Sequence, residues 1–258
     1  MTNRLPALFL GHGTPMNAIG RNAYTEIWAG LGREVGKPRA ILCISAHWYT
    51  RGTAVTAMER PKTIHDFGAF PQALFDVSYP APGDPQLARR VQELLAPVPV
   101  ALDDSWGLDH GAWGVLVHVY PQADVPIVQL SLDGTQPAEW HYEMGRRLAR
   151  LRDEGVLIVG TGNTVHNLRL YRRGQVVEPL DWAVRFEARM KAWMEAGDAA
   201  GFLHYESLGR DALMAVPTPE HLLPLFYVLG TRAADEPLSF PVEGFDGGSV
   251  SMMSVRVG

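Results

Sequence analysis

Short apolar runs alternate with amphipathic segments along the whole chain. The runs within residues 5–10, 39–46, 125–132 and 156–160 have the length and composition of strands buried on both faces of a parallel sheet. Segments with apolar positions at helical spacing separate them, at residues 23–31, 86–95, 112–120, 137–152 and 181–195. This alternation predicts an α/β fold: a single domain with a mostly parallel central sheet and helices on both faces.

Punctuation residues refine these boundaries. Asp84 is an N-cap residue and Pro85 a first-turn residue for the helix that follows them. Residues 48–85 form a long loop rich in His, Pro, Gly and aromatics, with a short strand at 53–58, and loops of this length are usually functional. A last helix is expected to begin at residues 217–221, and residues 249–257 to form a closing strand. No repeat or linker divides the chain, so residues 1–258 are expected to form one domain.

Three of the apolar runs lead into a histidine: His12, His47 and His166. In an open α/β sheet, ligands bind beyond the carboxyl ends of the strands, so these side chains are expected to converge. A cluster of neutral imidazoles at one point is usually a metal site. The sequence therefore predicts metal binding at this edge of the sheet.

A fourth histidine, His221, lies in the predicted first turn of the last helix. Thr218 is the expected N-cap and Pro219 the first helical residue, so the helix dipole opposes protonation of His221 and keeps it ready to bind a cation. Glu220 has two interpretations. It either complements the helix dipole or reaches the metal.

The remaining histidines have weaker contexts. His110 lies among glycines and aromatics in a segment too irregular for a core element, which favours a role in a binding loop. His65 fits a structural or a functional role equally well. The others lie within predicted helices and are expected to be structural or surface residues; they are His118, His141 and His204.

Composition narrows the class of protein. The chain has 258 residues, of which 47% are hydrophobic and 20% charged, as in ordinary globular proteins. Its net charge of −5 provides no basic surface for nucleic acid. No apolar run is long enough for a membrane span or a signal peptide, so no membrane partner and a cytoplasmic location are expected. The single cysteine, Cys43, lies in an apolar run and is expected to be a buried hydrophobe.

Several common catalytic motifs are missing from the sequence. It contains no Gly-x-Ser-x-Gly, Cys-x-x-Cys or His-Glu-x-x-His motif, which excludes serine hydrolases of that type, zinc fingers and zincin proteases. The glycine-containing loop at residues 160–167 fits neither the Rossmann nor the P-loop spacing, so nucleotide binding is only weakly supported.

The segments around these histidines resemble the class III extradiol ring-cleavage dioxygenases of the 4,5-DOPA dioxygenase type. The matching segments are residues 8–17, 44–48, 63–68, 108–111, 160–167 and 219–221, and the resemblance extends to the segment at 248–252. It implies a single catalytic α/β domain that opens a catechol such as DOPA with O2 and one divalent metal ion.

The resemblance also assigns roles to individual residues. It makes His12, His47 and His221 metal ligands. His166 becomes the acid/base residue, or a fourth ligand when no substrate is bound, and His110 a contact to substrate or oxygen. The expected partners are a small catecholic substrate and O2, with the protein a monomer or a small homo-oligomer.

The metal and the chemistry have alternatives at this stage. Non-haem Fe(II) oxygenases usually combine two histidines with a carboxylate, whereas a site of three or four histidines suits zinc at least as well. A zinc-dependent hydrolase is therefore one alternative. A non-catalytic metal-containing binding protein is another, because the fold also resembles that of the Memo proteins.

The carboxylate of DOPA would need a cationic or amide partner. No arginine lies in the histidine motifs, and the polar candidates within them are Thr14, Asn17 and Asn163.

Overall fold

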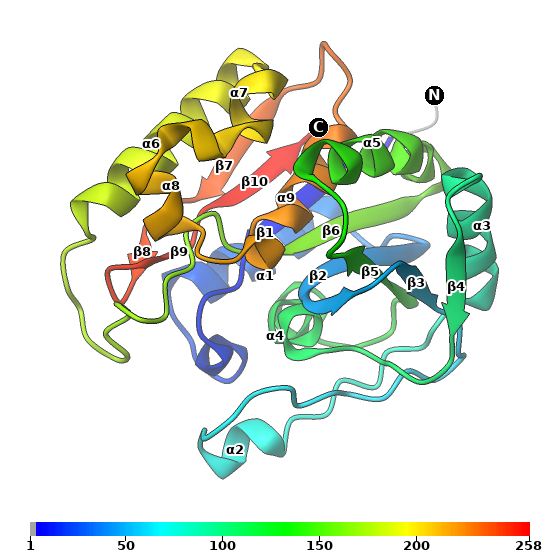
Figure 1. The fold of residues 1–258 in the computed structure, drawn as a ribbon. Helices are drawn as coiled ribbons and strands as arrows, with labels where there is room; N and C mark the ends of the chain where they lie inside the picture. Colours follow the sequence, from blue (N-terminus) through cyan, green and yellow to red (C-terminus); the bar gives the residue numbers. More distant parts are fainter. Residues whose placement is uncertain (1–3) are drawn as a thin grey trace.

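The computed structural model describes residues 4–258 and places a single mixed sheet at the centre of the molecule (Figure 1). Its strand order is β4-β3-β5-β2-β6-β1-β10-β7. The strands are β1 (Ala7–Gly11), β2 (Ala40–Thr50), β3 (Thr53–Thr56), β4 (Val100–Asp103), β5 (Ile127–Asp133), β6 (Val156–Gly162), β7 (Leu238–Val242) and β10 (Ser254–Val257). A separate pair consists of β8 (Phe245–Asp246) and β9 (Val250–Ser251).

The centre of the sheet is parallel, as predicted. Strand β6 pairs in parallel with both β1 and β2, and β2 pairs in parallel with β5. Antiparallel pairing is confined to the flanks, where β10 joins β1 to β7 and β3 joins β5.

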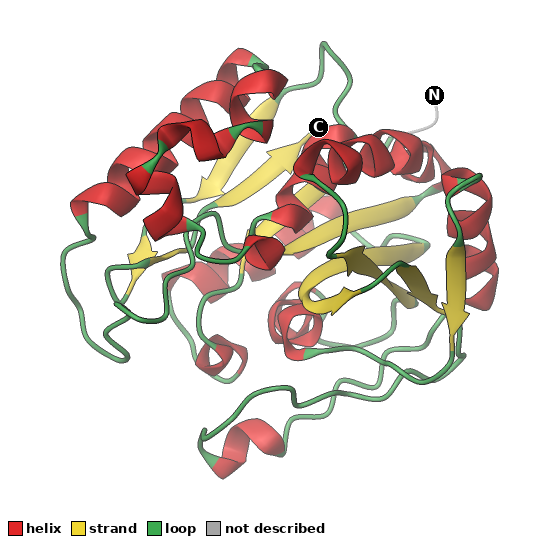
Figure 2. Ribbon diagram, viewed as in Figure 1, coloured by secondary structure: helices red, strands yellow, loops and turns green. Residues whose placement is uncertain are grey.

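Helices cover both faces of the sheet, which also confirms the prediction (Figure 2). The α-helices are α1 (Ala23–Val35), α2 (Gln72–Phe75), α3 (Pro85–Leu95), α4 (His110–Val119), α5 (Ala138–Leu148), α6 (Asp181–Ala196), α7 (Ala199–Leu203), α8 (Arg210–Ala215) and α9 (Leu223–Gly230). Short 3-10 helices are η1 (Pro15–Ala18), η2 (Ala149–Glu154), η3 (Tyr205–Leu208) and η4 (Pro219–His221).

Alternating side chains of the central strands feed two separate cores. Phe9 and Leu42 pack on the face covered by α3, α5, α6 and α9. Leu8 and Cys43 pack on the opposite face, against Trp113 and the rest of α1 and α4. Cys43 is thus a fully buried small hydrophobe, as expected from its apolar neighbours.

Two predicted elements at the carboxyl end of the chain differ from the structure. The last helix does not run continuously from residue 217, because Pro224 has no N–H to donate to the preceding turn. The segment forms η4 and then restarts as α9. The predicted strand at 249–257 is also interrupted: the N–H of Met252 donates to Gly244 O and that of Met253 to Ser251 Oγ, so β9 and β10 have different partners.

None of the helices in the described part of the chain is both long and apolar enough to cross a bilayer.

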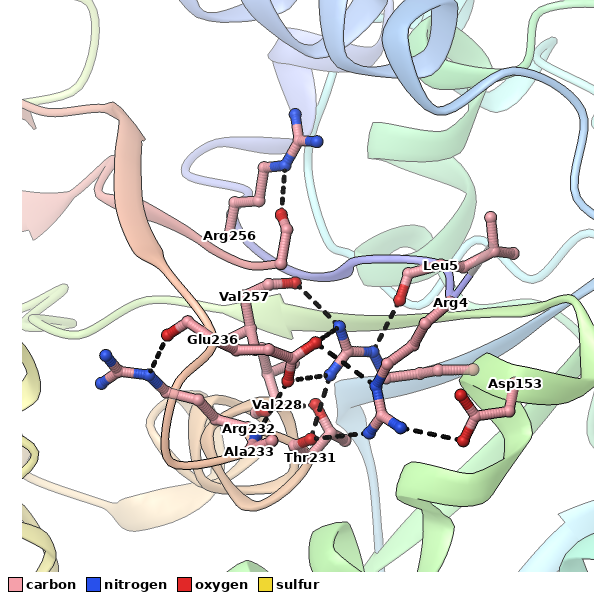
Figure 3. A network of polar contacts seen from close by, with 12 residues as sticks. Arg4, Leu5, Asp153, Val228, Thr231, Arg232, Ala233, Glu236, Arg256 and Val257 are labelled. Carbon is pink, nitrogen blue, oxygen red and sulfur yellow. Dashed lines mark hydrogen bonds and ion pairs between the residues drawn. The ribbon is translucent and has the colours of Figure 1, made fainter. Parts of the chain in front are cut away.

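A network of polar contacts fastens the amino ends of the central strands, and Figure 3 shows Leu5, Glu236 and Val257 close together in it. The side chain of Arg152 is completely buried and pairs with Glu236 through two contacts of 2.9 and 2.6 Å. It also donates to the carbonyl oxygens of Leu5, Thr231 and Val257. One guanidinium therefore links the approach to β1, the end of β10 and the end of α9.

We expect Arg152→Met to lower the free energy of unfolding by about 3 kcal/mol, because it removes the two-contact partner of the Glu236 carboxylate and one donor to each of three carbonyl groups. Arg4 and the N–H of Ala233 remain as contacts of Glu236. Chemical denaturation monitored by circular dichroism measures this. Removing both charges in Arg152→Met/Glu236→Met should cost less than the single change. Arg150→Ala is the control, since that side chain is 74% exposed. A single variant as stable as wild type would contradict the role of this network.

Candidate active site

Five histidines line one cavity of about 320 Å³ at the carboxyl edge of the sheet. They are His12, His47, His110, His166 and His221. The central strands β1, β6 and β2 are neighbours in the sheet and end at this edge, which is why residues distant in sequence meet here. His12 follows β1, His166 follows β6, and His47 lies inside β2, which continues to Thr50.

Three of these side chains form a compact set of metal-ligand type. One ring nitrogen each from His12, His47 and His221 lies within 4.8 Å of the others. The Nε2 atoms of His12 and His47 are 3.4 Å apart. Two nitrogens bound to one tetrahedral zinc ion are separated by about 3.4 Å, given bonds of about 2.0–2.1 Å. The donor set thus fits one divalent ion.

His166 lies beside this set rather than within it. Its ring stacks on that of His221, with centroids 3.4 Å apart and planes inclined by 11°. A second group of three potential ligand atoms consists of His166, Glu220 and His221. The backbone N–H of His166 donates to Ala215 O at 2.8 Å, which fixes its position against α8.

Asp66, which lies in the long loop, contacts two of the histidines. Its carboxylate oxygens lie 3.2 Å from His47 Nδ1 and 2.9 Å from His110 Nδ1. It also accepts the backbone N–H of His110 at 2.8 Å. A carboxylate on Nδ1 fixes the proton there and directs Nε2 toward the cavity, as in many carboxylate–histidine–metal arrangements.

The expectation that His110 belongs to an irregular segment is wrong. It is the first residue of α4 and is buried, and its ring lies 3.9 Å from that of His47 between centroids. The N-cap of this helix is the buried Asp109, which accepts the N–H of Ala112. Sequence reasoning missed this cap because the aromatic and glycine residues around it gave no helical period.

Asp109 also ties α4 to the sheet. It accepts a hydrogen bond from Ser45 Oγ at 2.6 Å and another from the Gln129 side chain. Ser45 Oγ in turn accepts the backbone N–H of His47 at 3.2 Å. The positions of His47 and His110 are therefore set by one buried network across β2, β5 and α4.

His221 is placed by close backbone packing. A Cβ at Gly162 would lie 2.1 Å from the carbonyl oxygen of His221, so only glycine permits this approach. The same carbonyl accepts the N–H of Asn163 at 2.8 Å. His221 ends the three-residue η4 and does not lie in the first turn of a long helix, so the predicted helix dipole is not the main influence on it.

Glu220 lies against the outer side of His221. Its Oε1 is 3.3 Å from His221 Nδ1 and accepts a hydrogen bond from Thr218 Oγ1 at 2.7 Å. Thr218 makes no side-chain capping bond, contrary to expectation, because its hydroxyl is directed to this carboxylate. The arrangement leaves Nε2 of His221 free to face the other imidazoles.

Burial keeps most of the imidazoles neutral. Desolvation, followed by the proximity of the other histidines, holds the pKa values of His12 and His221 well below the usual range. Burial lowers the pKa of His166 to about 4. His47 is the exception: burial opposes its charge, but Asp66 and Asp109 together raise its pKa.

Glu187 of α6 is buried and contacts the segment that leads to His166. Its carboxylate accepts hydrogen bonds from Thr164 Oγ1, at 2.8 Å, and from Ser251. Both partners lie close to His166 along the backbone. Thr164 is two residues before it, and Ser251 follows Val250, which forms an isolated β-bridge with His166. Burial raises the pKa of Glu187 to about 7.

The other four histidines lie outside the cavity lining. His65 Nε2 contacts Val77 O at 2.9 Å, which assigns the ambiguous residue to structure. The remaining three are structural or exposed, as expected: His118 contacts Asn17 O, His141 contacts the Tyr227 hydroxyl, and His204 contacts Glu139.

Three functional candidates escaped sequence reasoning: Asp66, Glu187 and Arg173. Asp66 lies within a resembling segment, which is a signal that could have identified it. Glu187 occupies an amphipathic helix where a charged residue looks solvent-exposed. Arg173 lines the same cavity from the segment after His166, although no motif includes it.

Comparison with known proteins agrees with this geometry. The family described as "Catalytic LigB subunit of aromatic ring-opening dioxygenase" matches residues 7–253. The chain belongs to this family. It is a class III extradiol dioxygenase of the 4,5-DOPA dioxygenase type, as the sequence resemblance implied.

Named relatives span the whole length of this dioxygenase. It is 54% identical to the "4,5-DOPA dioxygenase extradiol" of Escherichia coli (strain K12), over 100% of this chain and 96% of the relative. It is 37% identical to the protein of that name from Beta vulgaris, over 96% and 94% of the two chains. A crystal structure of an uncharacterized protein from Escherichia coli K12 has a TM-score of 0.88 at 49% identity, covering 99% of this chain and 100% of that one.

We expect Asp66→Asn to weaken binding of a divalent ion about 10–100-fold, because the change removes the carboxylate that orients His47. Competition with a chromogenic zinc chelator measures the affinity. The control Asp104→Asn alters an exposed carboxylate and should bind the ion like wild type. Unchanged affinity in a folded Asp66→Asn variant would exclude this orienting role.

Glu187 should make stability dependent on pH. Its raised pKa means that the folded protein holds this proton more tightly than the unfolded chain, so the contribution is full below pH about 4.5 and is lost as pH rises through about 7. The slope attributable to one such group is at most about 1.4 kcal/mol per pH unit.

Thermal unfolding of Glu187→Gln between pH 5 and 8 tests this. The wild-type midpoint should fall relative to that of the variant as pH rises, because glutamine stays neutral. Glu195→Gln, on an exposed position of the same helix, should run parallel to wild type. Parallel curves for Glu187→Gln as well would refute the assignment.

Proposed function

We propose that the single domain formed by residues 1–258 opens catechols such as DOPA by extradiol 4,5-cleavage with O2 at one divalent metal ion. The observation that carries this is the convergence of His12, His47 and His221, with ligand atoms within 4.8 Å, in a cavity that also contains two further histidines. Membership of the ring-opening dioxygenase family favours this chemistry over the zinc hydrolase and the non-catalytic binding protein.

We assign metal binding to the Nε2 atoms of His12, His47 and His221. When bound, a redox-active ion such as Fe(II) would supply a Lewis acid for the catechol oxygens and a route for electrons to O2, whereas zinc would supply only the first. Asp66 and Glu220 lie on the Nδ1 sides of His47 and His221, so both rings are held with Nε2 toward the ion.

His166 is suited to accept a proton from a catechol hydroxyl. It is neutral at physiological pH because burial lowers its pKa to about 4, and it lies in the cavity wall, stacked on a ligand. A neutral imidazole next to the substrate oxygen can remove the proton and return it later in the reaction. In this proposal His166 acts as the acid/base residue rather than as a fourth ligand.

His110 is suited to contact the substrate or oxygen. Asp66 faces its Nδ1 at 2.9 Å, so Nε2 is the nitrogen available to a bound molecule. Phe67, whose ring lies 5.3 Å from that of His110 between centroids, adds an apolar wall suited to an aromatic ring. The cavity thus combines a metal-ligand end with an aromatic one.

Substitution of His12 and His166 should separate metal binding from proton transfer. We expect His12→Ala to lose the bound ion and all turnover. His166→Ala should keep the ion and lose about 10²–10⁴-fold in kcat, the usual contribution of general acid–base catalysis. Metal content, oxygen uptake with DOPA and 4-methylcatechol, and the yellow semialdehyde product are the measurements.

His204→Ala is the matched control, because that ring is exposed and is not part of the cavity lining. Loss of the ion from His166→Ala would instead make His166 a ligand. If the Fe(II)-loaded wild type neither consumed oxygen nor formed the semialdehyde with any catechol, the proposed function would be wrong. Ester hydrolysis by the zinc form alone would favour the hydrolase.

A further inference from the structure

The cavity has one fixed positive charge, and it lies away from the histidine motifs. Among the described residues that line the cavity, Arg173 is the only lysine or arginine. It belongs to the segment that follows His166, from which Leu168 and Tyr171 also reach the lining. The lining also includes Phe67 and Phe70 of the long loop.

The segment that carries Arg173 is anchored through its two preceding residues, Tyr171 and Arg172. The Tyr171 hydroxyl donates to Asp246 Oδ2 at 2.7 Å, and the N–H of Arg172 donates to Gly247 O at 3.1 Å. Gly247 has φ +52°, and a Cβ there would lie 2.3 Å from the Tyr171 ring. This close packing holds the segment against the strand β8 and so fixes the backbone position of Arg173.

The guanidinium of Arg173 lies over an aromatic ring but has no hydrogen-bond or ion-pair partner among the described residues. Its central carbon lies over the Phe70 ring, 4.5 Å from the ring centroid, which is a cation–π contact. A contact of this kind uses no N–H donor, so the N–H groups remain available to a ligand. Within residues 4–258, no side chain or carbonyl accepts a hydrogen bond from it, and no carboxylate lies within 4.0 Å.

The acidic group of the same cavity is already engaged. Asp66 contacts His47 and His110, so its charge is directed at the metal-ligand end. The neighbouring arginines do not compete for the role, because Arg169 and Arg172 line a different hollow formed with Trp182 and Gly248. Among the described residues of the lining, Arg173 is therefore the one arginine or lysine that an anionic ligand group can reach, and its planar guanidinium is suited to a carboxylate.

We propose that Arg173 binds the carboxylate of the substrate and makes this dioxygenase select catechols that carry an acidic side chain. The inference rests on the proposed function and adds the class of substrate. The catechol ring would occupy the histidine end of the cavity while its side chain extends to the Arg173–Phe70 pair. The amino group of DOPA has no assigned partner, so a carboxylate without an amine should bind as well.

Anaerobic calorimetry with the zinc-loaded protein tests binding without turnover. The ligands are DOPA, 3,4-dihydroxyphenylpropionate, dopamine and 4-methylcatechol, of which only the first two carry a carboxylate. We expect Arg173→Ala to weaken binding of the two carboxylates about tenfold, as for loss of one charge-assisted pair, and to leave the other two unchanged. Arg173→Lys should fall between, because it retains charge without the fork.

Arg172→Ala is the matched control and should bind all four ligands like wild type. Parallel oxygen-uptake measurements with the Fe(II) form should show the same pattern in kcat/KM. Equal weakening of all four ligands by Arg173→Ala, or no weakening of the carboxylates, would overturn the inference. If carboxylate binding depended on Arg173 but no catechol were cleaved, the inference would stand and the proposed function would fail.

Discussion

The packing of five imidazoles around one cavity, three of them buried and two half-buried, is the constraint on which the site depends. Loss of contact with water disfavours the charged form, so the pKa values of His12, His110, His166 and His221 fall, whereas Asp66 and Asp109 raise that of His47. A neutral imidazole has a nitrogen lone pair that can accept a hydrogen bond or bind a cation. The Nε2 atoms of His12 and His47 are 3.4 Å apart, so both can bind one ion. A cavity of this composition is therefore suited to a metal ion before any substrate is considered.

The rest of the fold keeps these rings in place from both ends of the sheet. At the carboxyl edge, the buried Asp109 network helps to position His47, and the close backbone packing at Gly162 positions His221. At the amino edge, Arg152 and Glu236 join the chain ends to the start of the central strands. The central strands are thus held in place at both of their ends.

Local pattern predicted the central strands, the long helices and four histidines of the cavity, because each depends on a run of neighbouring residues. It failed at the short edge strands β4 and β7 and at the break between β9 and β10, where pairing partners decide the structure. It also misjudged His110, since the helix there begins at a cap that is satisfied by distant Ser45 and Gln129. Resemblance between motifs supplied the chemistry that spacing alone left open.

The sequence by itself determined the fold class, the placement of His12 and His166 after central strands, and the burial of Cys43 within an apolar run. These follow from periodicity and composition, which are local properties. Only the tertiary structure decided that Asp66 contacts two histidines, that His166 stacks on His221, and that Arg173 lines the cavity with its guanidinium over the Phe70 ring. Each joins segments far apart in the chain, and no local pattern encodes which loop packs against which.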